Sequence, residues 1–153
     1  MRILCTGAGG FIGSHVCAAL KGAGHHVIGL DTTIVAERPV MYDDFIVADI
    51  THPLSKIPDL DAVIHLAAIA APRDCDSDPA RAYAVNVNGT SQVLRMALAS
   101  GAKKVVFSSS AHVYDIPPRY LPTDETHPLR LNNTYTTTKI LGEKLCELYF
   151  ENH

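Results

Sequence analysis

Three regularly spaced glycines follow the first apolar run of the chain, and they restrict its fold more than any other feature. Residues 2–6 are typical of a β-strand, Gly7, Gly10 and Gly13 come next, and a helical pattern covers residues 11–23. Because glycine has no side chain, such a turn can be tight and can let a helix start approach a ligand closely. The order predicts a strand–turn–helix unit whose helix N-terminus binds a phosphate, although glycine spacing alone also fits a plain structural turn.

The rest of the chain alternates short β-branched runs with longer helical stretches. The sequence predicts strands over 2–6, 26–30, 45–48, 62–66 and 104–108, and helices over 11–23, 79–100 and 133–149. Residues 32–42 are expected to form a loop or a ragged helix. Apolar strands separated by helices indicate a parallel sheet covered on both faces. The predicted fold is therefore α/β, a doubly wound parallel (Rossmann) sheet with strand order 3-2-1-4-5 and ligands at the carboxyl ends of the strands.

The composition fits one such domain and argues against other classes of protein. The 153 residues are 47% hydrophobic and 19% charged, with a net charge of −3 and no basic run, so we expect no nucleic-acid partner. The longest apolar stretch, residues 62–72, is too short to cross a bilayer, and a glycine comes too early for a signal peptide. We therefore expect a cytoplasmic domain with no membrane partner. The cysteines and histidines show no metal-ligand spacing, and no metal is expected.

The second predicted strand ends at an acidic residue, Asp31. A carboxylate in this place can accept hydrogen bonds from both hydroxyls of an adenosine ribose. No basic residue follows before Arg38, so nothing obvious neutralises a 2′-phosphate, and NAD is favoured over NADP as the cofactor. The alternative is an ordinary turn residue at the end of a strand.

Two further strand ends carry residues that suit a dinucleotide. Asp49 and Ile50 follow the third strand and can bracket the adenine edge through a carboxylate and a backbone N–H. Leu66, Ala67 and Ala68 follow the fourth strand, where small side chains leave room for the cofactor. A plain turn explains the first pair as well, and ordinary packing explains the second group equally well.

A reactive site is expected where the fifth strand and the last helix meet. Ser110 closes a serine run after the strand, and Tyr135 and Lys139 stand one helical turn apart. A phenol ionises near pH ~10 in water, and a nearby cation favours its ionised form. Tyr135 can then take a proton from a substrate alcohol while NAD takes a hydride from the same carbon, with Ser110 holding the oxygen. A tyrosine and a lysine at this spacing are also a common accident.

The order of these motifs resembles that of the extended short-chain dehydrogenase/reductase family, in its NAD-dependent epimerase/dehydratase branch. The resemblance covers essentially the whole chain and includes residues 86–90 and 108–114 besides the motifs above. It implies Tyr135 as the base, Lys139 as its tuner and a ribose ligand, and Ser110 as the third catalytic member. The cofactor contacts that it implies are Gly7, Gly10, Phe11, Ile12, Gly13, Asp31, Asp49, Ile50, Leu66, Ala67, Ala68, Tyr135 and Lys139. Asn86 is expected to shape the helix beside the cofactor.

The chain departs from the family pattern at Asp115, Thr134 and Thr138, none of which removes a group that transfers a proton. His112 and Val113 follow where a dehydratase normally has an acidic pair, so an epimerase is preferred over a dehydratase. Family members are roughly twice as long. We therefore expect residues 1–153 to be an NAD-binding Rossmann domain whose sheet is incomplete at its C-terminal side and whose substrate domain is missing.

The resemblance implies an NAD-dependent epimerase of the UDP-glucose 4-epimerase type that acts on a nucleotide sugar. An NAD(P)-dependent reductase or hydroxysteroid-type dehydrogenase of the same family is the alternative enzyme. A cofactor-binding fragment or regulator without turnover is the alternative of another class. The resemblance also implies a homodimer that pairs the helices over 79–100 and 133–150.

Overall fold

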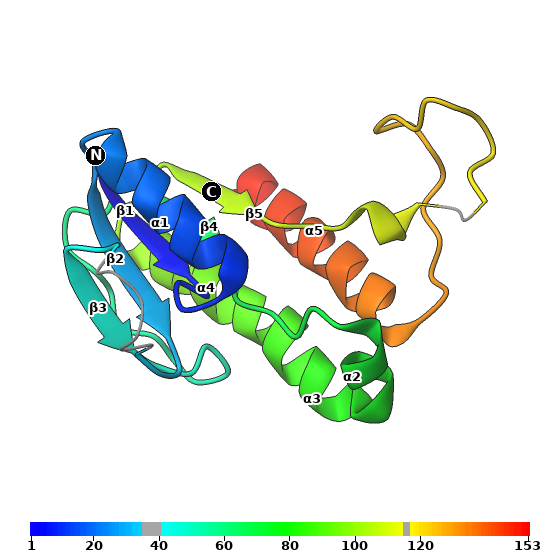
Figure 1. Cartoon of the computed structure of the whole chain (residues 1–153), viewed down its shortest axis with the longest axis horizontal. Coiled ribbons are helices and arrows are strands. Elements are labelled where there is room, and N and C mark those ends of the chain that lie inside the picture. The colour runs from blue at the N-terminus through cyan, green and yellow to red at the C-terminus, as the bar shows by residue number, and fades with distance from the viewer. Residues whose placement is uncertain (35–40, 115–116) are drawn as a thin grey trace.

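The computed structural model describes residues 1–34, 41–114 and 117–153. Within them, one parallel sheet has the order β3-β2-β1-β4-β5. Its strands are β1 (Arg2–Thr6), β2 (His26–Asp31), β3 (Asp44–Val47), β4 (Ala62–His65) and β5 (Lys104–Phe107). This order confirms the predicted doubly wound sheet (Figure 1). Arg38, Asp115 and most of the expected loop over 32–42 lie outside the described residues.

Helices pack on both faces of the sheet. They are α1 (Phe11–Gly22), α2 (Pro72–Ser77), α3 (Pro79–Tyr83), α4 (Thr90–Ala99) and α5 (Thr134–Asn152), with a π-helical segment, Ala84–Gly89, joining α3 to α4. Figure 1 shows α1 on one side of the strands and α4 on the other, with α5 alongside β5. The predicted helices over 11–23 and 133–149 are therefore confirmed, with ends that differ from the prediction by a few residues, while the range 79–100 is divided into three helical segments.

Alternating residues of the strands build two separate apolar layers. Leu4 of β1 packs with Ile28 of β2 and Val93 of α4 in the larger core. Its neighbour Cys5 points to the opposite face and packs against Cys17 of α1. Because successive strand side chains point to opposite faces, a sheet that is apolar on both faces needs helices on both.

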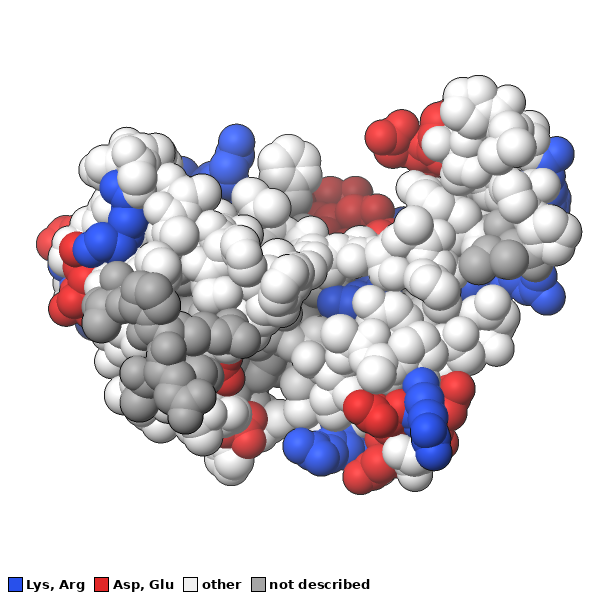
Figure 2. Space-filling model, viewed as in Figure 1, with Lys and Arg blue, Asp and Glu red and all other residues white. Residues whose placement is uncertain are grey.

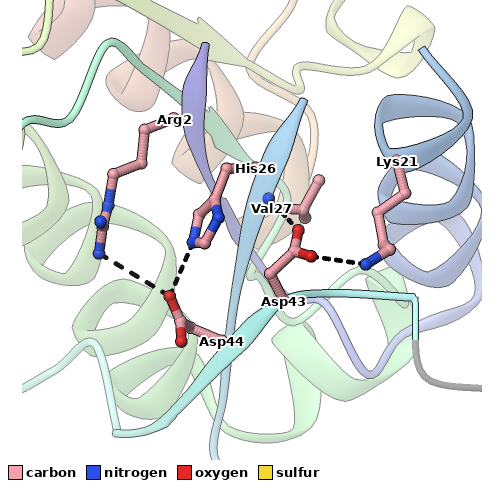
Figure 3. Close-up of polar contacts among 6 residues, drawn as sticks. All are labelled: Arg2, Lys21, His26, Val27, Asp43 and Asp44. Atoms are coloured by element: carbon pink, nitrogen blue, oxygen red, sulfur yellow. Dashed lines mark hydrogen bonds and ion pairs between the residues drawn. The ribbon is translucent and has the colours of Figure 1, made fainter. Parts of the chain in front are cut away.

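The amino ends of the strands are tied together by ion pairs and hydrogen bonds (Figure 3). The Asp43 carboxylate accepts from the Lys21 ammonium and from the Val27 backbone N–H, at 2.7 and 2.8 Å. These two donors lower the pKa of Asp43. Asp44 lies 2.8 Å from the His26 ring and 3.8 Å from the Arg2 guanidinium. These contacts join β1, β2 and α1 to the start of β3.

Three elements were not predicted: α2, the π-helical segment and a 3-10 helix over Ala111–Val113. The short helix α2 carries only one buried residue, Cys75, so its sequence has no apolar period that could reveal it. The π-helical segment interrupts the single helix expected over residues 79–100, whose first turn Asp78 caps by accepting the Arg81 backbone N–H at 3.0 Å. No helix among the described residues is long and apolar enough to cross a membrane.

Candidate functional site

The turn after β1 has a geometry that only glycine fits. Gly7 has a φ of +72°, and a Cβ on it would lie 2.8 Å from the Ala67 backbone nitrogen. A Cβ on Gly13 would overlap the Gly7 carbonyl oxygen. The glycines therefore let α1 begin against the end of β1, with its first backbone N–H groups at the carboxyl edge of the sheet.

Asp31 lies against this turn rather than apart from it. One carboxylate oxygen accepts the Gly9 backbone N–H at 2.9 Å, and the other accepts the Thr32 N–H at 2.7 Å. The Gly7 N–H also donates to the Leu30 carbonyl at 2.8 Å. The carboxylate at the end of β2 and the glycine turn therefore form one unit that suits a ribose beside a pyrophosphate.

Two apolar side chains directly after the glycine turn are exposed to solvent. Phe11 and Ile12, the first residues of α1, are 76% and 58% exposed. The Leu66 and Ala67 backbone N–H groups donate to the Thr6 hydroxyl at 3.2 Å. The segment after β4 is thereby held against the end of β1, next to Gly7.

The two residues after β3 differ from one another. Asp49 is exposed and accepts the Thr51 backbone N–H at 2.9 Å, and hydrogen bonds from Thr51 lower its pKa. Ile50 is buried in the core and fills the space where a side chain on Gly89 would stand. An adenine contact from this pair would therefore use the Asp49 carboxylate and backbone N–H groups, not the Ile50 side chain.

Tyr135 and Lys139 lie in the first turns of α5, and both are buried. Asn133 caps the helix with a side chain that accepts the Thr136 N–H at 2.9 Å. The Lys139 ammonium donates to the Ser108 carbonyl at 2.9 Å and lies 5.9 Å from the centre of the Tyr135 ring. Burial lowers the pKa of Lys139, while Cys75 acts in the opposite direction.

The end of β5 is fastened to α5 at two successive serines. Ser108 accepts from Lys139, and Ser109 donates to Glu143, a residue that the sequence analysis missed. The available signal was its position one helical turn beyond Lys139, on the same face. Ser110 comes next, and its hydroxyl accepts the His112 N–H at 3.2 Å. No hydrogen bond joins the Ser110, Tyr135 and Lys139 side chains to one another in the described part of the chain.

Asn86 lies in the π-helical segment and is buried. It accepts the Ile69 N–H at 2.8 Å and donates to the Ile69 carbonyl and to the Thr138 hydroxyl, both at 3.0 Å. These contacts join the segment after β4 to α5. Asn86 thus holds the π-helical segment against both neighbours, as expected for a residue that shapes the helix beside the cofactor.

The expected site residues lie at or just after the carboxyl ends of the strands, or in the first turns of α1 and α5. The face seen in Figure 2 is hollowed between the part that carries α1 and the part that carries α2 and α3, and acidic and basic side chains are mixed around it. The described residues contain no cluster of side chains that could hold a metal ion. The arrangement offers an anion site, a ribose carboxylate, and a phenol with an ammonium nearby, which suits proton transfer beside a bound dinucleotide.

Comparisons with known proteins agree with this arrangement. The family model of the NAD dependent epimerase/dehydratase family matches residues 3–153. A UDP-glucose 4-epimerase from Mycolicibacterium smegmatis is 36% identical over 97% of this chain and 51% of its own length.

Solved structures show the same relation. A short-chain dehydrogenase/reductase superfamily protein from Agrobacterium tumefaciens, with bound NAD, has a TM-score of 0.84 at 33% identity over 99% of this chain and 46% of its own. A UDP-glucose 4-epimerase from Thermotoga maritima, with UDP-glucose, has a TM-score of 0.85 at 28% identity over 99% of this chain and 52% of its own. The chain thus spans about half the length of these relatives. It belongs to the NAD-dependent epimerase/dehydratase family.

Proposed function

We propose that residues 1–153 form the NAD-binding Rossmann domain of a sugar-nucleotide epimerase of the UDP-glucose 4-epimerase type. The observation that carries this proposal is the placement of Tyr135 and Lys139, which are buried one helical turn apart at the carboxyl ends of the strands, where the glycine turn also lies. Membership of the family and the activities of the relatives named above support it.

The proposed cofactor is NAD. The pyrophosphate would lie on the N–H groups at the start of α1, and the ribose hydroxyls would donate to Asp31. The bound cofactor would cover the Phe11 and Ile12 side chains, which are now exposed to solvent. A relative with bound NAD, 33% identical to this chain, supports the choice.

In the proposed reaction NAD supplies the hydride acceptor, and the chain supplies the proton chemistry. Tyr135 takes the hydroxyl proton of the sugar, so that the alcohol carbon can give up its hydride and become a carbonyl. The Lys139 ammonium lies 5.9 Å from the centre of the Tyr135 ring. Ser110 would donate a hydrogen bond to the sugar oxygen and hold it near the phenol. Return of the hydride to the opposite face of the carbonyl carbon, with the proton going from Tyr135 back to the oxygen, would invert that carbon.

The test is interconversion of UDP-glucose and UDP-galactose by the full-length gene product that contains these residues. We expect Tyr135→Phe to lower kcat by about 100- to 10,000-fold, because the variant lacks the group that accepts the proton. Tyr149→Phe, in the last turns of the same helix, is the control and should leave kcat unchanged. NAD binding without any turnover of a nucleotide sugar, or full activity of Tyr135→Phe, would contradict the proposal.

We also propose a homodimer that pairs the helices over 79–100 and 133–150. Leu98 of α4 and Leu141 and Leu148 of α5 are exposed, although both helices also carry buried apolar residues. Apolar side chains that stay exposed on two neighbouring helices favour association. A cytoplasmic location remains part of this proposal.

A further inference from the structure

Five buried polar residues form a hydrogen-bonded series between the glycine turn and α5. They are Thr6 on β1, His65 on β4, Asn86 in the π-helical segment, Thr90 on α4 and Thr138 on α5. Side chains make every link except one, in which the Asn86 backbone carbonyl accepts from Thr90. None of the five is more than 2% exposed. Because a buried polar group without a partner is costly, a fully paired series fixes each of its members in one place.

The hydrogen bonds of His65 select one neutral form of its ring. The Thr90 hydroxyl donates to the backbone carbonyl of Asn86 at 2.6 Å, so toward His65 it can only accept. The His65 Nε2–H therefore donates to Thr90 at 3.0 Å, and Nδ1 accepts the Thr6 hydroxyl at 2.7 Å. Burial, with a contribution from the Lys139 charge, lowers the pKa of His65 to about 3 and keeps the ring neutral.

The other half of the series ends on the backbone of Tyr135. The Asn86 amide donates to the Thr138 hydroxyl at 3.0 Å. That hydroxyl donates in turn to the Tyr135 carbonyl at 2.8 Å. Thr138 stands directly before Lys139, so one hydroxyl touches the turn that carries both reactive side chains.

At its first end the series reaches the cofactor turn. The Thr6 hydroxyl accepts the Leu66 and Ala67 backbone N–H groups while it donates to His65. Gly7 follows Thr6 and packs against Ala67 so closely that it leaves no room for a side chain. The series therefore connects the backbone that would hold the cofactor to the backbone that holds Tyr135.

We propose that this series, with His65 at its centre and Thr138 at its end, positions Tyr135 relative to the cofactor turn. The proposal rests on the proposed function, since it assigns Tyr135 to proton transfer. His65, Thr90 and Thr138 are positioning residues, because none of them has to touch the substrate. Small displacements of a reacting group cost rate far more than they cost affinity.

Thr138 provides the sharper test, in the full-length protein. Thr138→Val keeps the shape of the side chain and removes the hydroxyl, whereas Thr138→Ser keeps the hydroxyl. We expect Thr138→Val to lower kcat by about 10- to 100-fold with KM for UDP-glucose unchanged, as for a misplaced reacting group. Thr138→Ser should retain the activity of the unmodified protein.

His65 tests the middle of the series. His65→Asn places an amide oxygen where Nδ1 lies, so it keeps the acceptor for Thr6 and removes the donor to Thr90. We expect it to lower kcat in the same way. The double variant with Thr138→Val should lose less kcat than the product of the two single fold-losses, because both changes break the same connection.

Ser100→Ala is the matched control, since Ser100 also has a paired hydroxyl but lies at the far end of α4, where it accepts the Ile57 N–H at 2.9 Å. The melting temperature of each variant is measured alongside kcat. If Tyr135→Phe abolishes turnover but the His65 and Thr138 variants change kcat no more than Ser100→Ala, the series only stabilises the core and the inference is wrong. If Tyr135→Phe leaves turnover intact, the proposed function itself fails.

Discussion

His65 couples the stability of the chain to pH, because its ring is enclosed between Thr6 and Thr90. Its pKa is lowered from 6.5 to about 3 by burial and by the Lys139 charge. Below pH 6.5 the unfolded chain binds a proton at this ring that the folded chain does not bind until about pH 3. The contribution of His65 to the free energy of unfolding is therefore complete above pH 6.5 and is lost as the pH falls toward 3.

We predict that the difference in free energy of unfolding between His65→Gln and the unmodified chain becomes smaller as the pH falls from 7 to 4. The expected narrowing is up to about 1.4 kcal/mol per pH unit, because glutamine does not titrate. Urea unfolding at the two pH values measures it. Thr90→Val, which breaks the same hydrogen bond but keeps the imidazole, should retain the pH dependence. A constant gap for His65→Gln would show that the ring is not held neutral.

Asp31 is the residue on which cofactor binding should depend most directly. Its carboxylate accepts the Gly9 and Thr32 N–H groups and is partly exposed, so it can also accept from a ribose. We predict that Asp31→Asn weakens NAD binding by about 10- to 100-fold, the usual worth of a hydrogen bond to a charged group. Isothermal titration calorimetry measures the change. Asp49→Asn, at the end of the neighbouring strand, tests whether the second carboxylate contributes as much to NAD binding. If Asp31→Asn bound NAD as tightly as the unmodified chain, the assigned role of Asp31 would be wrong.

At the scale of elements, the sequence predicted what depends on local geometry and missed what depends on tertiary contacts. The glycine turn was predictable because a side chain at Gly13 would strike the backbone of Gly7, earlier in the same turn. The π-helical segment was not, since its hydrogen bonds to Ile69 and Thr138 come from distant parts of the chain. The contact between Ser109 and Glu143 likewise exists only because α5 lies against β5. The assigned roles of Ser110, Tyr135 and Lys139 stay predictions.

The junction between β1 and α1 gives the sharpest contrast between two glycines of one helix. Gly13→Ala should force α1 away from the Gly7 carbonyl, lower the free energy of unfolding by about 1–3 kcal/mol and weaken NAD binding. Gly22→Ala meets open space at the other end of α1 and should stabilise the chain by up to about 1 kcal/mol. Thermal unfolding with and without NAD compares the two, and equal effects would contradict this account.

At the scale of the whole molecule, apolar surface remains on the side of α4 and α5. Leu98, Leu148 and Phe150 are 46%, 53% and 88% exposed. β5 forms the edge of the described sheet, and Val106 on it is half exposed. The strand order followed from general rules of chain topology, which is why it could be predicted. Which surfaces meet a partner depends on shape that no sequence pattern records.

We predict that the chain associates through α5. Leu148→Glu should shift sedimentation toward the monomer, because a charge would replace an apolar contact in the interface. Leu121→Glu, on an exposed leucine of the loop before α5, is the matched control and should leave the association unchanged. A monomer for the unmodified chain at high concentration, or equal sedimentation of both variants, would contradict the proposed dimer.

The wide turn at residues 84–89 makes this region intolerant of a change in length. A π-helical turn holds one residue more than an α-helical turn, and each residue of an α-helix rotates its face by about 100°. Loss of a single codon here would let the helix close to a regular α-helix. Either the Asn86 amide or the Val93 side chain would then face away from its present neighbours. A related sequence that keeps both contacts must therefore keep the same number of residues in this segment.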